Sequence, residues 1–371
     1  MSNRREFLKY AAGASAGIFL ARNGPSGSLA QSSQQGAAAR HREIFINGRR
    51  IRTVDVHSHI ALPEAAEVVK GTPLEKYAAG GQTRPGTNPN SLGPERLQTM
   101  DEMGVDVQVV SINAWWYSAS RDLARKLIDV QNERLAALCA ARPDRFVALA
   151  SVALQYPELA AQQMEDAIKH LGMRGAAIGG SVEGEELSSP KFDPFWAKAE
   201  EMQALIFMHP QDSAVATGVS ARVNGNGALD NVIGNPLETT IFLSHLIFEG
   251  TLDRFPNLKI CAAHGGGYLP SYSGRMDQGC LTIPGRCPKK LQKRPSEYLR
   301  QLYFDAMVFN PEGLRHLIGV CGVSQLCIGS DYSFAWEEHP VDQVLATPWL
   351  TDGDRVAILS DNIRTLLKIP A

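Results

Sequence analysis

The stretch Val54-Asp55-Val56-His57-Ser58-His59 decides how this chain is expected to fold. Thr53 to Val56 is β-branched and apolar enough to form a buried strand, which His57-x-His59 closes. Residues two apart in a strand point to the same side, so both imidazoles are predicted to emerge together at the strand's carboxyl end. Two neutral imidazoles in this arrangement can hold a divalent metal ion. Two ordinary histidines remain an alternative, because a lone His-x-His is weak evidence.

Strand and helix patterns alternate through the rest of the chain. Near-continuous apolar strands that are each followed by a helix indicate a parallel sheet, and eight such strands close as a (β/α)₈ TIM barrel. We therefore predict one α/β barrel domain over residues 53–371. After the first strand, the predicted strands are 105–112, 146–154, 174–180, 204–208, 259–263, 303–308 and 325–328, and the predicted helices are 95–103, 120–141, 157–171, 193–202, 237–253, 311–320 and 354–367.

Metal-competent and proton-competent side chains stand at four of the strand ends. In this fold, catalytic groups belong at the carboxyl ends of the strands. His57, His59, His209 and Asp331 make a His₃Asp ligand set with a position left for water, which a catalytic zinc site requires. His264 is the predicted general base or acid, because imidazole titrates near neutral pH. The alternative for His264 is a core histidine bonded to a carbonyl group.

The composition narrows the classes of partner. The chain has 371 residues, a formal net charge of −2 and 44% apolar residues, and no run of basic residues stands in its body. Nucleic acid and anionic membrane surfaces are therefore not expected partners. No apolar run reaches the length needed to span a bilayer.

The N-terminus is expected to be a targeting segment. Arg4-Arg5 before Phe7-Leu8-Lys9, a mildly apolar stretch and Ser28-Leu29-Ala30 resemble a twin-arginine export signal with its cleavage site. We assign residues 1–30 to this signal and expect a periplasmic or exported protein, or a cytoplasmic one if the signal is not used. The alternative is a frayed basic N-terminus.

The sequence also predicts the structure of two further segments and the state of the cysteines. Residues 31–52 are predicted to be a linker and a short hairpin that turns at Asn47-Gly48 on the bottom of the barrel. The Gly/Pro-rich stretch 61–94 is predicted to be a long functional loop. Of the six cysteines, Cys280 and Cys287 are a candidate disulfide pair, and the other four are expected to be buried thiols.

Four motifs contain the predicted metal and proton-transfer residues: His57-x-His59, His209-Pro210, His264-Gly-Gly-Gly and Gly329-Ser-Asp331-Tyr-Ser-Phe334. Together they carry a resemblance to the amidohydrolase superfamily, and more narrowly to the branch that contains aminocarboxymuconate-semialdehyde decarboxylase. It continues outside these motifs at 100–109, 255–261, 275–277 and 295–298. It implies a barrel of the metal-dependent hydrolase type, the ligand set given above and His264 as the catalytic base.

The resemblance also implies residues that bind the substrate. Arg84 matches an arginine that grips a substrate carboxylate, and Arg275 matches one that reaches the neighbouring site in the family's dimers. A homodimer is therefore expected, and Phe334 is expected at the substrate. The alternatives are a solvated loop residue for Arg84, and an ion pair with Asp277 or a charge at a helix end for Arg275. The segment 211–235 lacks tryptophans that the family carries there, and 115–117 (Trp-Trp-Tyr) is either an aromatic wall or packing.

We expect a metal-dependent, non-oxidative decarboxylase of a small unsaturated or aromatic carboxylic acid. It would need one divalent ion, zinc before manganese or iron, because such a ligand set accepts several ions. The first alternative is a hydrolase of a lactone, ester or amide, or a hydratase, in which Asp331 shuttles the proton. The second is a binding protein that keeps the barrel without the chemistry.

Overall fold

The computed structural model describes residues 41–78, 88–211, 222–223, 225–287, 289–334, 336–337 and 339–370, all within one compact unit, Ala39–Ala371. Arg84 and the predicted export signal lie outside these residues. Within the described ranges, no helix has the length and apolar character needed to cross a membrane.

Eight parallel strands form the barrel wall. Strands β3, β4 and β5 form one sheet, and β6 with β9, β10, β11 and β12 forms the other. The bridges Asp55↔Ile328 and Ala150↔Ala176 join the two sheets at both edges, so the wall is closed and the predicted (β/α)₈ barrel is confirmed. The strands are β3 (Val54–His59), β4 (Val107–Ser111), β5 (Phe146–Ala148), β6 (Gly175–Ile178), β9 (Leu205–Met208), β10 (Lys259–Ala262), β11 (Tyr303–Asp305) and β12 (Leu326–Cys327).

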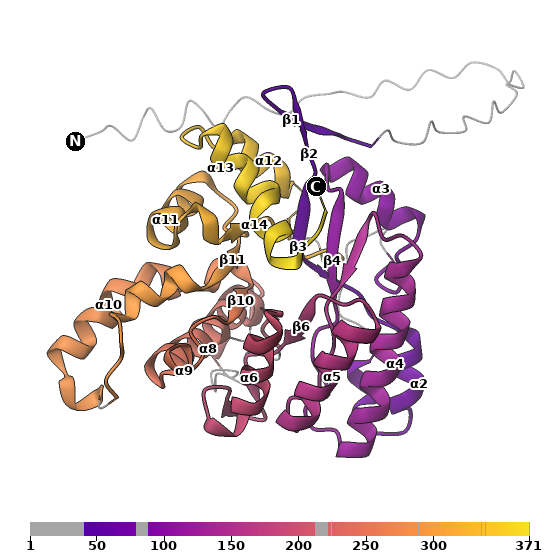
Figure 1. Ribbon diagram of the computed structural model, residues 1–371, viewed down its shortest axis with the longest axis horizontal. Coiled ribbons are helices and arrows are strands. Elements are labelled where there is room, and N and C mark those ends of the chain that lie inside the picture. Colours follow the sequence, from indigo (N-terminus) through magenta and orange to yellow (C-terminus); the bar gives the residue numbers. More distant parts are fainter. Residues whose placement is uncertain are drawn as a thin grey trace, which may run out of the picture. The chain divides into compact units, whose positions relative to one another are not determined.

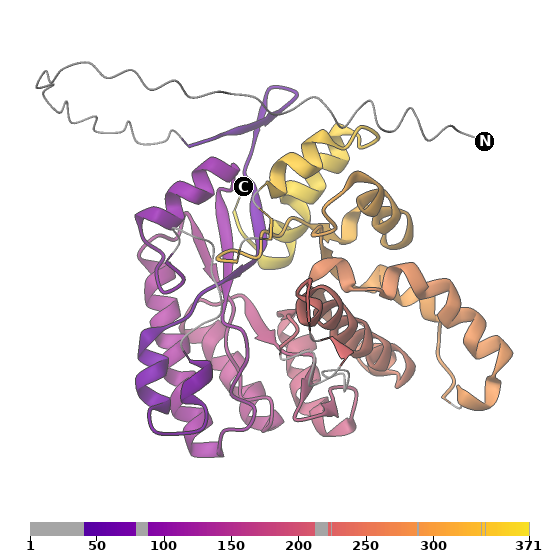
Figure 2. The ribbon, with the colours of Figure 1, turned by 180° about the vertical axis from the view of Figure 1, so that it is seen from behind.

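Helices cover the outside of the barrel (Figure 1). All six residues of β3 are buried because one face of the strand packs inside the barrel and the other faces the outer layer. Figure 2 shows the barrel from behind, and both views place the C-terminal helices beside β3. The main helices are α3 (Pro94–Met103), α4 (Arg121–Ala140), α5 (Pro157–His170), α6 (Asp193–Met202), α8 (Asn235–Phe248), α10 (Leu269–Thr282), α11 (Pro311–Cys321), α12 (Pro340–Ala346), α13 (Asp352–Val356) and α14 (Asn362–Leu367).

Several predicted boundaries were wrong. The predicted strand 146–154 was too long, and only β5 (Phe146–Ala148) forms a strand. The apolar residues that follow it are buried but do not pair with a neighbouring strand as part of β5. The predicted helix 237–253 divides into α8 and α9 (Thr251–Arg254) at Gly250, whose φ is 69°. The predicted helix 354–367 contains a π-helical turn, Ala357–Asp361, between α13 and α14. Helices α10 and α12 were not predicted.

The hairpin and the disulfide agree with the sequence. Strands β1 (Ile44–Ile46) and β2 (Arg49–Ile51) pair antiparallel around Asn47 and Gly48, whose φ values of 51° and 75° suit a two-residue hairpin turn. Cys280 and Cys287 form a disulfide at the end of α10, and the other four cysteines are free and buried.

The predicted long loop 61–94 is partly helical. It contains α2 (Pro63–Val69), which begins with a proline at its first position, and the 3₁₀ turn η1 (Glu75–Tyr77). The remaining short elements are β7 (Ser181–Val182), β8 (Glu185–Glu186), η2 (Pro190–Phe192), η4 (Asp230–Gly234), η5 (His264–Gly266), η6 (Pro284–Arg286), η7 (Pro295–Gln301) and η8 (Val323–Gln325).

Candidate active site

A cluster of imidazoles and one carboxylate occupies the carboxyl ends of the barrel strands. His57, His209, His264 and Asp331 each offer one ligand atom, and these atoms all lie within 4.8 Å of one another. His57 belongs to β3, His209 follows β9 directly, and His264 and Asp331 lie two and four residues after the ends of β10 and β12. The strand ends therefore bring together the residues that the sequence placed there.

His59 adjoins this group from the same strand as His57. Its Nε2 lies 2.9 Å from Nε2 of His57 and 3.0 Å from Oδ1 of Asp331. The rings of His59 and His209 have their centroids 4.6 Å apart. Both imidazoles of the His-x-His pair thus point to one place, as the strand period predicts.

The protonation states of three members suit metal binding. Burial would raise the pKa of Asp331, but the charge of His57 and hydrogen bonds from His264, His57 and His59 outweigh burial and hold that pKa well below its ordinary value. Burial lowers the pKa of His59 to about 4 and that of His209 well below its ordinary value. At neutral pH the group therefore offers a carboxylate and two neutral imidazoles, the forms that bind metals.

Asp305 orients His57, and the sequence pattern did not point to Asp305. Its Oδ2 lies 2.7 Å from Nδ1 of His57, and its carboxylate also accepts the backbone N–H groups of His264 and Gly265 at 2.9 and 2.8 Å. With Nδ1 held by Asp305, Nε2 of His57 is left to face the cluster. Burial opposes protonation of His57, but Asp331 and Asp305 together raise its pKa to about 10.

Replacing Asp305 with asparagine is expected to weaken metal retention or turnover by about 10- to 100-fold, the usual cost of losing a carboxylate behind a metal-binding histidine. An amide nitrogen would face either the His57 ring and the His264 N–H, at the position of Oδ2, or the Gly265 N–H, at the position of Oδ1. Metal content after dialysis against a chelator measures the effect. Asp253→Asn, at a carboxylate bonded to the Tyr298 hydroxyl, is the control. Wild-type retention in D305N would contradict the orienting role.

A second buried carboxylate ties the first strand to the last. Asp55 accepts the Ser330 hydroxyl at 2.5 Å and the backbone N–H of His57 at 3.0 Å. The backbone N–H of Asp331 in turn donates to the carbonyl of His57 at 2.9 Å. Burial raises the pKa of Asp55 to about 6. These bonds fix the distance between the two chain segments that carry His57 and Asp331.

The backbone at the cluster adopts left-handed conformations. His264 and Asp331 have φ values of 56° and 55°, a region that side chains other than glycine rarely enter and that is typical of functional sites. A Cβ on Gly266 would lie 2.6 Å from the Phe304 ring, and one on Gly267 would lie 2.1 Å from the Pro236 carbonyl oxygen. Glycine is therefore needed at both positions, because a larger residue would clash with Phe304 or with the backbone of Pro236.

The donors fit a divalent metal ion. Both ring nitrogens of His209 are buried and have no hydrogen-bond partner within the described part of the chain. Buried polar atoms are rarely left unbonded, and a metal ion would satisfy one of these nitrogens. Imidazoles and a carboxylate are the ligands that zinc, manganese and iron accept. The described cluster therefore constitutes a candidate metal centre.

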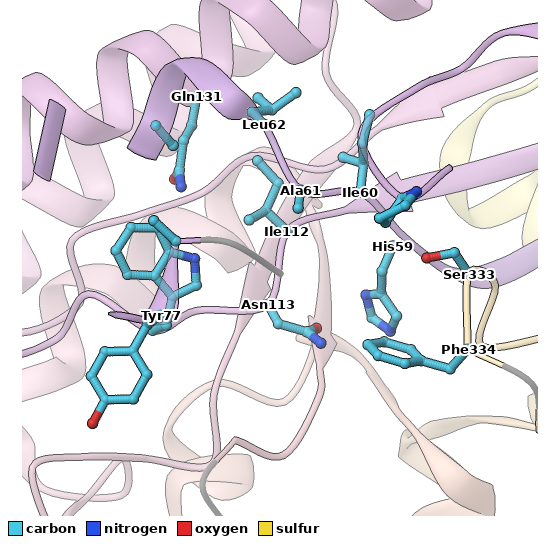
Figure 3. Close-up of a pocket in the computed structure, with 14 residues that line it drawn as sticks. His59, Ile60, Ala61, Leu62, Tyr77, Ile112, Asn113, Gln131, Ser333 and Phe334 are labelled. Carbon is cyan, nitrogen blue, oxygen red and sulfur yellow. The ribbon is translucent and has the colours of Figure 1, made fainter. Parts of the chain in front are cut away.

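Two cavities open beside the cluster. One, of about 200 Å³, is lined by His59, Phe334 and residues of the β3 and β4 loops (Figure 3). The other, of about 430 Å³, is lined by His264 and residues that include Tyr268 and Met307. The ring of Phe334 lies 5.8 Å from that of His59, so the structure places this predicted substrate residue at the cluster.

Arg275 lies away from both cavities of its own chain. It is exposed on α10, in a separate surface pocket with Phe248 and the Cys280–Cys287 disulfide. Asp277, its alternative partner, instead accepts hydrogen bonds from the backbone and hydroxyl of Ser296 at 2.9 and 2.6 Å.

The three aromatic residues after β4 differ in position: one lines a cavity, and the other two are packed inside the protein. Trp115 lines the smaller cavity. Trp116 is fully buried, and its indole N–H donates to the Val152 carbonyl at 2.9 Å. The Tyr117 hydroxyl accepts the backbone N–H of Gly179 at 3.1 Å. Only the first of the three aromatic residues therefore reaches the candidate site.

The chain belongs to the amidohydrolase family, whose model matches residues 54–369. This confirms the resemblance carried by the motifs. One relative is the 2-amino-3-carboxymuconate-6-semialdehyde decarboxylase of Dictyostelium discoideum, which is 30% identical over 79% of this chain and 84% of its own length. Another is the gamma-resorcylate decarboxylase of Rhizobium sp. strain MTP-10005, which is 29% identical over 85% of this chain and 98% of its own length.

A solved structure shares the fold. The 5-carboxyvanillate decarboxylase of Novosphingobium aromaticivorans, in complex with manganese and 4-hydroxy-3-methoxy-5-nitrobenzoic acid, matches with a TM-score of 0.75 at 23% identity. The match covers 86% of this chain and 96% of that one. At this level of identity the match shows that the two proteins share the barrel fold.

Proposed function

We propose that this protein is a metal-dependent, non-oxidative decarboxylase of a small aromatic or unsaturated carboxylic acid. The observation that carries the proposal is the buried cluster of His57, His59, His209 and Asp331, with His264 beside it at a cavity. The decarboxylases among the relatives, which cover nearly the same length of chain, support the reaction class.

We assign the four buried residues as ligands and His264 as the proton-transfer group. The His264 side chain is 15% exposed, against at most 5% for His57, His59 and Asp331. The more accessible imidazole is the one that can exchange a proton with substrate, while the buried ones can hold an ion. Zinc is our first assignment, and manganese, which the carboxyvanillate enzyme holds, is the second.

The chain's own residues would divide the chemistry among them. The metal ion, when bound, supplies a Lewis acid and lowers the pKa of water. Nε2 of His264 lies 3.9 Å from Oδ2 of Asp331, at the edge of the cluster, and the imidazole can take up a proton there and deliver it to the carbon that loses CO₂. The carboxylate leaves as neutral CO₂, and the proton takes its place on that carbon. Phe334 would pack against the organic part of the substrate beside His59.

Two arginines would hold the anionic substrate. We propose that Arg84 binds the carboxylate and that Arg275 reaches the site of a second copy in a homodimer. Guanidinium groups bind carboxylates through two parallel hydrogen bonds, which suits an acid that must be anchored before it loses CO₂. The exposure of Arg275 on α10 supports a role outside its own barrel.

Metal analysis combined with a CO₂-release screen tests the function. The purified protein is expected to hold about one divalent ion per chain and to release CO₂ from at least one acid among carboxylated phenols, muconates and pyrimidines. A chelator should abolish release, and the restored ion should return it. Unchanged turnover in Arg84→Ala would argue against carboxylate anchoring. Bound metal without CO₂ from any of these acids would contradict decarboxylation and favour hydrolysis.

We also propose that the protein is exported through its twin-arginine-type segment, residues 1–30. The Cys280–Cys287 disulfide supports this, because disulfides persist in oxidising compartments such as the periplasm. Cell fractionation checks it. Replacing Arg4 and Arg5 with lysines should move the protein from the periplasm to the cytoplasm, and an unchanged distribution would contradict export by this route.

A further inference from the structure

Gln131 carries a buried amide that no side chain or backbone group among the described residues uses. It lies in the middle of α4 with 0% exposure, and neither its Nε2 nor its Oε1 has a hydrogen-bond partner among the described residues. It lines the same cavity of about 200 Å³ that His59 and Phe334 line. In Figure 3 the amide points from α4 into the cavity, and His59, Ser333 and Phe334 stand on the other side.

A buried amide in this position lowers the stability of the folded protein unless another group forms hydrogen bonds with it. A buried donor or acceptor that loses water without gaining a partner pays its full desolvation cost, whereas an apolar side chain of the same length pays none. Buried polar groups in proteins are accordingly bonded to protein, ordered water or a ligand. Gln131 lies in the wall of a cavity next to the cluster of histidines and Asp331. This placement favours a ligand as the hydrogen-bond partner of its amide.

Asn113 adds a second buried polar atom to this cavity. Its Oδ1 is buried and has no hydrogen-bond partner within the described ranges. An amide oxygen accepts hydrogen bonds only, so it requires an O–H or N–H donor. Most of the remaining wall is apolar or aromatic, with Ile60, Ala61, Leu62, Ala65, Tyr77, Ala78, Ile112 and Trp115. Apart from His59 and Ser333, the two amides are therefore the polar side chains of an otherwise apolar and aromatic wall.

The cavity volume suits a single substituted ring. An apolar cavity of about 150 Å³ holds benzene. The cavity here, at about 200 Å³, has room for one ring and a small substituent. A ring whose carboxylate lies at the cluster beside His59 would direct its far side toward Gln131.

We propose that Gln131 is a specificity-determining residue, which binds a hydroxyl or amino group on the side of the substrate ring farthest from the carboxylate. The inference rests on the proposed decarboxylation. The glutamine amide can both donate and accept, so it serves either substituent, while Asn113 requires a donor. The site should therefore discriminate against rings with a methyl group at that position.

Matched acids and matched variants test this. The acids are pairs that carry either a hydroxyl or a methyl group opposite the carboxylate, and the variants are Gln131→Met, Gln131→Glu and the exposed Gln162→Met on α5. Wild type and Q162M should prefer the hydroxyl acid in kcat/KM by on the order of tenfold or more. In Q131M the hydroxyl acid should lose roughly tenfold, with the methyl acid within about twofold of wild type. Q131E, which keeps an acceptor, should retain part of the preference.

An equal preference in wild type and Q131M would overturn the proposal and leave ordered water as the partner of the amide. Absence of CO₂ release from every acid would instead count against the proposed reaction. In that case calorimetry of the metal-loaded protein with the corresponding phenol and toluene derivatives still decides the role of Gln131. Weaker binding of the phenols alone in Q131M supports the subsite, and equal binding by all variants refutes it. Thermal melting shows whether each variant is folded.

Discussion

Asp331→Asn is expected to lower kcat by on the order of 10³-fold and to release most of the bound metal. The carboxylate supplies the negative charge in a cluster that is otherwise made of imidazoles. Its Oδ1 lies 3.0 Å from His59 and 3.2 Å from His57. A neutral amide would keep the shape of the side chain but would lose the charge that balances a divalent cation in this buried place. Metal content and steady-state turnover measure the two losses.

The control for this variant is Asp361→Asn, an exposed carboxylate that pairs with Arg364 at 3.5 Å. It should retain wild-type metal content and turnover. A D331N protein with a full complement of metal would show that the carboxylate is not a ligand. A reduced turnover in that protein would then have to come from proton transfer alone.

His264→Gln is expected to lower kcat by roughly 10²- to 10⁴-fold and to leave the metal in place. Glutamine cannot exchange a proton near neutral pH, but it preserves much of the volume of the imidazole. His59→Gln is the matched comparison, because it should release the ion. The pair separates a ligand from a proton-transfer group, since the structure places both imidazoles within reach of Asp331.

The opposite result would reassign the two histidines. If H264Q loses the metal and H59Q keeps it, the ligand set is the four-member group of His57, His209, His264 and Asp331. The proton would then have to travel through another group. A KM that rises while kcat stays unchanged in H264Q would likewise contradict its role in the chemical step.

Much of the site could be predicted from the sequence because its residues stand at strand ends. A barrel strand is a local pattern, and the residue that follows it faces the same rim as those of its neighbours. His209 and His264 follow such predicted strands directly, and Asp331 lies three residues after the predicted strand 325–328. The positions of Asp55 and Asp305 carry no such signal. Asp55 lies inside β3, and the predicted strand 303–308 hid the fact that β11 ends at Asp305.

Gln131 was missed although the sequence held a clue. It lies four residues after Leu127 and four before Leu135, on the apolar stripe of the predicted helix 120–141. A polar residue on a buried stripe needs a partner, but the helix pattern alone cannot show what lies opposite. The strand lengths were overestimated for a related reason, since apolar residues continue past the ladder wherever the chain stays beneath a helix.

The bonds from Asp55 to Ser330 and from Asp331 to His57 join the first strand of the barrel to the segment that follows its last strand. A ribosome must therefore finish nearly the whole polypeptide before this centre can exist. A truncated product that ends before residue 331 lacks both the anionic ligand and the C-terminal helices α12, α13 and α14. Such a fragment would keep the histidines but would lack the carboxylate needed to bind the ion tightly. Binding of the metal ion before synthesis is nearly complete is therefore disfavoured.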